Sequence, residues 1–117
     1  MEILELEKSL FKLEYMSNRD YLNEIIDDSY LELGKSGNFI DKDLVINELV
    51  NLKEDRSIDI YNYICNQIDN NTYLVHYITI SNNQLFYRTS IWKKQYKYKL
   101  LFHQASLIYD KVDLIKF

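Results

Sequence analysis

The sequence predicts an α+β fold in which helices from the first half of the chain pack on a curved, mainly antiparallel sheet from the second half. Apolar residues recur at helical spacing up to about residue 52, and they alternate with polar residues after Asp55. Short turn sequences then separate successive alternating stretches, which is typical of an antiparallel meander. The 117 residues are enough for one domain, and we predict a domain over 1–106 with a C-terminal extension over 107–117.

Three helices and one short strand are expected before the sheet. Residues 2–15 carry an apolar stripe at helical spacing, made of Ile3, Leu6, Leu10 and Leu13. Ser17 or Asn18 can cap a second helix that carries Tyr21, Leu22, Ile25 and Ile26. A short strand at 29–33 runs into the turn 34–37, whose two glycines allow a positive φ. Asp41 is a suitable N-cap for a third helix at 42–52.

Four long strands are predicted at 57–67, 72–80, 84–93 and 97–108. Asn82-Asn83 reads as a two-residue hairpin loop, which pairs Ile80 with Leu85. A three-residue loop at 94–96 pairs Trp92 with Tyr98, Ser90 with Leu100 and Arg88 with Phe102. Because side chains alternate along a strand, these two turns decide which residues share a face of the sheet.

The two faces of the predicted sheet are both largely apolar. The first face, which we expect to turn toward the helices, has polar groups among aromatic ones: Tyr73, Val75, Tyr77, Phe86, Arg88, Ser90, Trp92, Tyr98, Leu100, Phe102 and Gln104. The second carries Leu74, His76, Ile78, Ile80, Leu85, Tyr87, Ile91, Leu101 and His103. An outer sheet face is normally polar, so we expect a second copy of the chain to cover this one.

Charge and composition exclude several classes of partner. The chain has 18 acidic and 14 basic residues, whereas proteins that bind nucleic acids usually present a basic surface. The first ten residues carry acids where a signal peptide would carry Lys or Arg, and no apolar run is long enough to span a bilayer. We therefore predict a cytoplasmic protein that binds neither nucleic acid nor membrane.

Three segments carry a family resemblance: residues 27–34 with Ser36-Gly37, residues 88–92, and residues 99–104. With the order of the predicted elements, they make the chain resemble the nuclear transport factor 2-like, or cystatin-like, superfamily. Within it the chain looks like the bacterial group named domain of unknown function 4440. The resemblance covers about residues 4–106 and implies a cone with an internal cavity, and a dimer packed through the outer sheet face.

By this similarity, six residues would face the cavity: Tyr30, Glu32, Ser90, Trp92, Phe102 and Gln104. The assignment of faces adds Tyr77 and Arg88 as further ligand-binding residues. Glu32 is the candidate general base, because burial beside aromatic side chains raises the pKa of a carboxyl group. The alternative is a structural role for Glu32, in which its carboxylate is hydrogen-bonded to the 34–37 turn or to Arg88. Arg88 itself either clamps an anionic ligand or pairs with Glu32.

No metal site or cofactor is predicted from the sequence. The two histidines and the scattered carboxylates have no spacing that would bring three ligands together. The predicted homodimer contact consists of the outer-face residues His76, Ile78, Tyr87, Ile91, Leu101 and His103. In this register His103 is therefore a packing residue at the dimer surface and not a catalyst.

Three functional hypotheses follow from the predicted fold. The first is a dimeric domain that binds a small ligand without catalysis. The second is an isomerase, cyclase or hydrolase that acts on a small organic substrate with Glu32 as base. The third is a dimerisation or interaction module, to which the apolar tail 107–117 contributes by extending the last strand, covering the cavity or reaching the partner.

Overall fold

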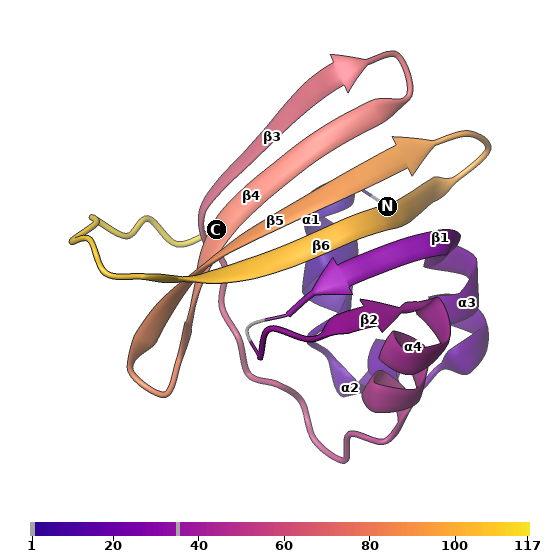
Figure 1. The fold of residues 1–117 in the computed structure, drawn as a ribbon, viewed down its shortest axis with the longest axis horizontal. Helices are drawn as coiled ribbons and strands as arrows, with labels where there is room; N and C mark the ends of the chain where they lie inside the picture. The colour runs from indigo at the N-terminus through magenta and orange to yellow at the C-terminus, as the bar shows by residue number, and fades with distance from the viewer. Residues whose placement is uncertain (1, 35) are drawn as a thin grey trace.

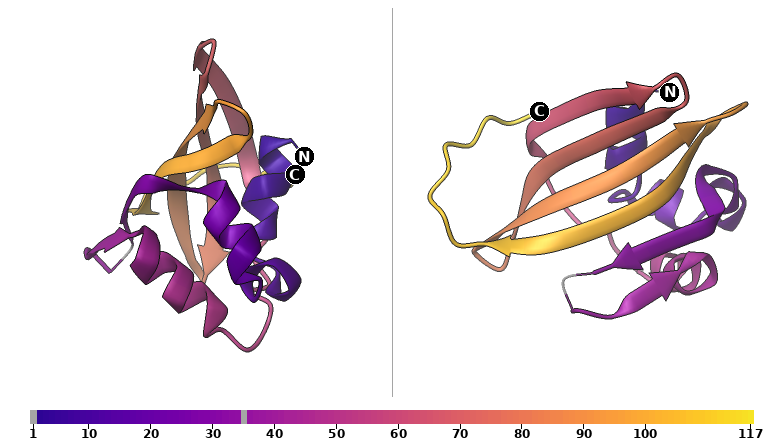
Figure 2. Two further views of the ribbon diagram at one scale, coloured as in Figure 1. Left: turned by 90° about the vertical axis from the view of Figure 1, so that its right-hand side faces the viewer. Right: turned by 45° about the horizontal axis from the view of Figure 1, so that its top comes forward.

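The computed structural model describes residues 2–34 and 36–117 and confirms the α+β fold (Figure 1). Its elements are α1 (Ile3–Ser9), α2 (Leu13–Met16), α3 (Arg19–Ile25), β1 (Ile26–Leu33), β2 (Phe39–Asp41), α4 (Lys42–Val50), β3 (Tyr61–Asp69), β4 (Thr72–Ser81), β5 (Gln84–Lys94) and β6 (Tyr98–Ile108). The six strands form one sheet in the order β2-β1-β6-β5-β4-β3. Only β1 and β6 run parallel; the other neighbours are antiparallel. The sheet curves, and the helices lie on its concave side (Figure 2).

The predicted helix 2–15 is divided into α1 and α2, with a break at residues 10–12. The loop before β3 fixes this break, because Arg56 N donates to Phe11 O at 3.0 Å and Leu13 N donates to the Asp55 carboxylate at 2.5 Å. These contacts join residues more than forty positions apart, so helical periodicity could not reveal them. The break turns Phe11 into the core, where its side chain is buried.

The two predicted helix caps are confirmed. Asn18 Oδ1 accepts a hydrogen bond from Tyr21 N at 3.1 Å, and Asp41 Oδ1 accepts one from Leu44 N at 3.0 Å. Gly37 has a φ of 83°, as the 34–37 turn requires, whereas Lys35 lies outside the described residues. The short strand β2, which pairs with the end of β1, was not predicted from the sequence.

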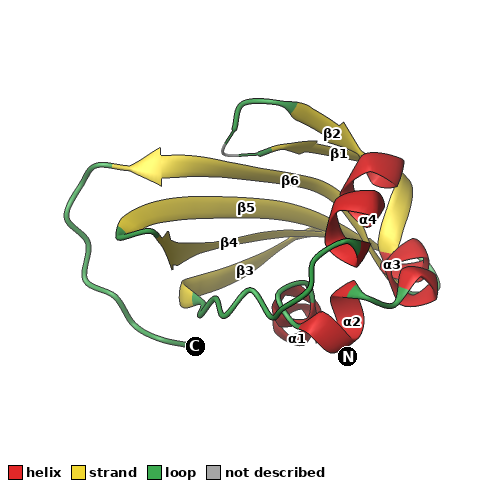
Figure 3. Cartoon of the chain, turned by 90° about the horizontal axis from the view of Figure 1, so that it is seen from below, coloured by secondary structure: helices red, strands yellow, loops and turns green. Residues whose placement is uncertain are grey.

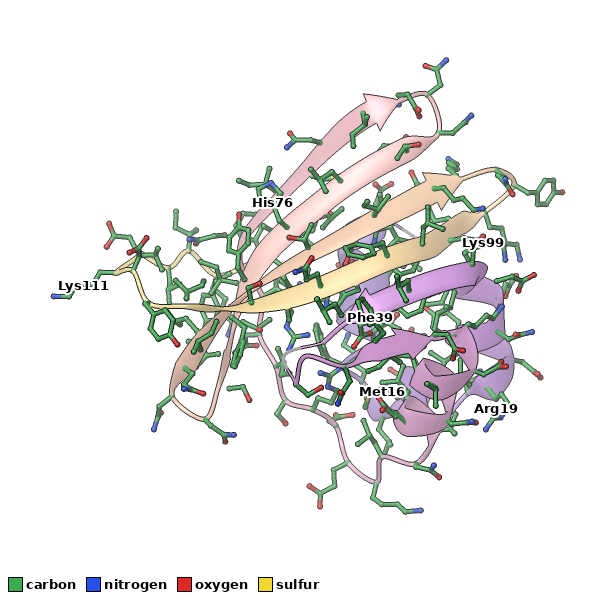
Figure 4. All side chains as sticks on the ribbon, in the orientation of Figure 1. Met16, Arg19, Phe39, His76, Lys99 and Lys111 are labelled. Atoms are coloured by element: carbon green, nitrogen blue, oxygen red, sulfur yellow. The ribbon has the colours of Figure 1, made fainter. Side chains whose placement is uncertain are left out.

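The hairpin between β4 and β5 has the predicted register. Asn82 and Asn83 both have a positive φ, 52° and 63°, as a two-residue type I′ turn needs. Ile80 pairs with Leu85 and His76 with Thr89. Val75 and Tyr77 therefore point into the core, while His76 between them lies on the convex face (Figure 4).

The hairpin between β5 and β6 differs from the prediction in two ways. Its loop is 95–97, so Trp92 pairs with Leu100 and not with Tyr98. A β-bulge follows, after which Ile91 pairs with Phe102 and Ser90 with His103. The bulge inserts Leu101 as an extra residue and inverts the alternation along the rest of β6. Consequently Phe102 and Gln104 lie on the convex face, and His103 turns into the molecule.

The tail after β6 crosses to the edge strand β3 (Figures 1 and 3). Asn62 N donates to Ile115 O at 2.8 Å, and Phe117 N donates to Ile60 O at 2.9 Å. The Phe117 ring lies 5.9 Å from that of Tyr63. The tail of this chain thus binds the start of β3.

Candidate functional site

A cavity of about 270 Å³ lies between the concave face of the sheet, α1, α4 and the loop before β3. Its polar lining is Glu7, Tyr30, Glu32, Glu48, Arg56, Tyr77, Arg88 and His103. Its apolar lining is Leu10, Phe11, Ile26, Val45, Leu49, Leu52 and Leu100. Such a mixture of apolar walls and a few charged groups is typical of small-molecule sites.

The structure brings four of the predicted site residues to this cavity: Tyr30, Glu32, Tyr77 and Arg88. Ser90 and Trp92 are fully buried and hold lining residues in place. The expectation that Phe102 and Gln104 reach the cavity is wrong, because the bulge in β6 turns both side chains to the convex face.

The expectation that His103 lies on the outer face is wrong for the same reason. His103 is buried, lines the cavity and sits beside Glu32 across the parallel pairing of β1 with β6. Only the shifted register places it there, and no feature of the sequence around Leu101 indicates the bulge.

Glu7 is the functional candidate that the sequence analysis missed. Its side chain is almost completely buried, with 2% of the residue exposed. Tyr77 OH donates to Oε1 at 2.5 Å, and Trp92 Nε1 donates to Oε2 at 2.7 Å. The sequence does indicate that Glu7 is buried, because it stands four residues after Ile3 and three before Leu10, on the apolar stripe of α1.

Burial raises the pKa of the Glu7 carboxyl above its usual value, because a low-dielectric interior disfavours the charged form. Hydrogen bonds from Tyr77, Trp92 and Ser90 and the charge of Arg88 act in the opposite direction without cancelling it. A carboxyl group that binds a proton more readily than an exposed one therefore lines the cavity.

A hydrogen-bonded chain joins Arg88 to Glu7 through His103 and Ser90. Arg88 Nη1 lies 3.4 Å from His103 Nε2, and His103 Nδ1 lies 2.8 Å from Ser90 Oγ. A guanidinium can only donate, so we assign Nε2 as the acceptor and Nδ1 as the protonated nitrogen. Ser90 then receives a hydrogen bond from His103 and can donate its own proton to Glu7.

Glu32 lies at the cavity wall, where the half-buried carboxylate accepts a hydrogen bond from Tyr30 OH at 2.5 Å. Burial and the neighbouring Glu32 charge raise the pKa of Tyr30, which therefore remains a donor. Glu32 Oε2 would lie 3.3 Å from a Cβ at position 34, so Gly34 leaves room for the carboxylate.

Within the described part of the chain, no group of three His, Cys, Asp or Glu side chains is placed to hold a metal ion. No helix in that part is long and apolar enough to cross a membrane.

We predict that His103 makes stability fall as the pH is lowered. Burial and the charges of Arg88 and Arg56 lower its pKa to about 3, against about 6.5 in an unfolded chain. The unfolded state thus binds more protons below pH 6.5, and the free energy of unfolding falls by up to about 1.4 kcal/mol per pH unit. In urea unfolding, the free energy of unfolding of wild type should fall relative to that of His103→Gln as the pH is lowered from 7 to 4.5. A pH-independent difference would contradict the prediction.

Comparisons with known proteins agree with the architecture. No family model and no curated protein matches the sequence. An NTF2-like protein from Cytophaga hutchinsonii superposes with a TM-score of 0.72 at 23% identity, covering 91% of this chain and 95% of the other. An NTF2-like protein of unknown function from Prochlorococcus gives 0.72 at 20% identity, covering 94% and 93%.

A cystatin-like fold protein from Burkholderia xenovorans gives a TM-score of 0.69 at 13% identity, covering 91% of this chain and 85% of the other. At these identities the likeness establishes the fold alone. The chain therefore has the cone-shaped α+β fold called NTF2-like or cystatin-like.

Proposed function

We propose that this protein binds a small organic molecule in the cavity between the helices and the concave sheet face. The observation that carries this proposal is a cavity with apolar walls that is also lined by polar and charged side chains from several elements: Glu7 from α1, Arg88 from β5 and His103 from β6. Groups that converge from distant parts of a chain fix the orientation of a ligand, while apolar walls supply contact area. Membership of the domain of unknown function 4440 group and a cytoplasmic location remain predictions from the sequence.

Filling the cavity should abolish binding. Leu49 lines it from α4 and is 8% exposed, whereas Leu44 on the same helix is 50% exposed and lies outside it. Compounds that raise the Tm of wild type in a metabolite screen should also stabilise Leu44→Trp but not Leu49→Trp. Circular dichroism checks that both variants are folded. Equal stabilisation of Leu49→Trp would place the binding site elsewhere, and a screen without any binder would oppose the proposal.

Proton transfer by Glu32 is the second candidate function. The carboxylate is half-buried, lines the cavity and forms no salt bridge among the described residues, so one oxygen can accept a proton from a bound substrate. For any substrate turned over by wild type, Glu32→Gln should lower kcat by at least about 100-fold, the usual range for general bases, without lowering the Tm. Unchanged kcat would remove Glu32 from the chemistry.

We also propose that the convex face forms a homodimer. Of the predicted contact residues, His76, Tyr87 and Ile91 lie on this face, whereas Ile78 in the same register is buried within the chain itself, with 2% exposed. The half-buried Phe102 and Gln104 take the place of the inward-turned His103, and Leu101 occupies the bulge. Ile64, Ile80 and Tyr87 are each more than a third exposed, as apolar groups at a contact would be in one subunit alone.

Sedimentation equilibrium should give wild type the mass of two chains. Tyr87→Lys should shift the mass toward one chain, because a charge would be buried at the contact. Asn70→Lys, in the exposed turn between β3 and β4, is the matched control. A wild-type protein of single-chain mass at micromolar concentration would contradict the dimer.

A further inference from the structure

We propose that the ligand is a small organic anion, whose charged group is bound by Arg88 and Arg56 and whose apolar body packs against the cavity wall. This inference rests on the proposed function, since it names the class of molecule that the cavity takes. It is carried by two arginines that line the cavity and form no salt bridge with a carboxylate of the described residues.

Arg88 is a buried cation that forms no salt bridge with any described residue. It is 7% exposed and lines the cavity. Its Nε donates to Thr79 Oγ1 at 2.8 Å, and its Nη1 lies 3.4 Å from His103. Both partners are neutral, and the hydrogen bonds shown use only these two nitrogens, which leaves Nη2 for a ligand. Buried charges are normally paired, because an unpaired one costs several kcal/mol of desolvation.

Arg56 places a second guanidinium at the same side of the cavity. The Phe11 ring lies beneath both groups, with its centroid 4.7 Å from Arg56 Cζ and 5.7 Å from Arg88 Cζ. The Arg56 hydrogen bond shown runs from Nη1 to the carbonyl oxygen of Leu10, at 3.5 Å. Burial and the charge of Arg88 lower the pKa of Arg56, as expected for two cations that share a poorly solvated space.

The carboxylates that line the cavity form no salt bridge with either arginine, and they act on them only at longer range: the charge of Glu32 opposes the lowering of the Arg56 pKa, and the charge of Arg88 opposes the rise in the Glu7 pKa. Within the described chain the salt bridges all involve lysines, and neither arginine lies within 4.0 Å of a carboxylate. Both oxygens of Glu7 accept hydrogen bonds, from Tyr77 and Trp92, and one oxygen of Glu32 accepts a hydrogen bond from Tyr30. Glu48 is exposed at the cavity rim. An anion that enters between the arginines would therefore remove a repulsion and form charge-assisted hydrogen bonds with both.

The size and walls of the cavity narrow the class of anion. A volume of about 270 Å³ equals about nine water molecules at about 30 Å³ each, which suits an anion such as benzoate or hexanoate. Apolar side chains also line the cavity, with Val45, Leu49 and Leu100 among them. They favour an organic anion with an apolar body over inorganic phosphate.

Calorimetric titration with matched probes tests this inference. Benzoate and hexanoate should bind wild type at least about ten-fold more tightly than benzamide and hexanamide, since hydrogen bonds to charged groups contribute about 1.5–3 kcal/mol. Inorganic phosphate should bind more weakly than either carboxylate. Arg56→Gln and Arg88→Gln should each weaken carboxylate binding at least about ten-fold and leave amide binding unchanged.

Arg19→Gln is the matched control, because Arg19 projects from α3 at the periphery of the molecule and bonds only to Asn47 among the described residues (Figure 4). It should bind both probe classes as wild type does. Arg88→Gln loses the hydrogen bond to Thr79 and could unfold for that reason. In that case Arg56→Gln, which keeps this hydrogen bond, still tests the inference.

Amides that bind as tightly as carboxylates would overturn the anion inference while leaving a ligand-binding cavity. If inorganic phosphate binds more tightly than the carboxylates, the inference that the ligand has an apolar organic body is wrong. Binding of no probe, together with an unproductive metabolite screen, would overturn the proposed function as well.

Discussion

The buried Glu7 carboxylate is the constraint on which the rest of the cavity depends. It ties α1 to β4 through Tyr77 and to β5 through Trp92, and so fixes the distance between the helix and the concave face. Leaving these donors unpaired in the interior would cost about 1–3 kcal/mol for each. Glu7 therefore fixes the position of this part of the cavity lining. Ser90, which also hydrogen-bonds to Glu7, connects it to His103.

The second constraint is the bulge in β6, because one inserted residue decides the chemistry of the cavity. Without it, Phe102 and Gln104 would face the helices and His103 would face solvent. With it, a neutral histidine lies between Arg88 and Ser90. The interior then holds two guanidinium groups whose side-chain hydrogen-bond partners are uncharged, and the proposed anion site rests on this feature.

The sequence predicts those features of the fold that depend on local patterns. Asn18 and Asp41 as caps, and Asn82-Asn83 as a tight turn, follow from backbone preferences of single residues. The break after α1 and the bulge at Leu101 do not, because both depend on contacts between distant segments. Tyr77 and Arg88 were predicted from alternation, and Tyr30 and Glu32 from the family resemblance. Glu7 required the interpretation of a polar residue on an apolar helical stripe as a buried one. Arg56 lies in an irregular loop, where alternation gives no signal.

The most direct test of this account is a crystal structure of the protein with 4-bromobenzoate, located by the anomalous scattering of bromine. The account predicts bromine among Val45, Leu49 and Leu100, and carboxylate oxygens within hydrogen-bond distance of Arg88 Nη2 and the Arg56 guanidinium. A bromine site in the cavity with the carboxylate directed at solvent beside Glu48, or a cavity without bromine at saturating ligand, would contradict it.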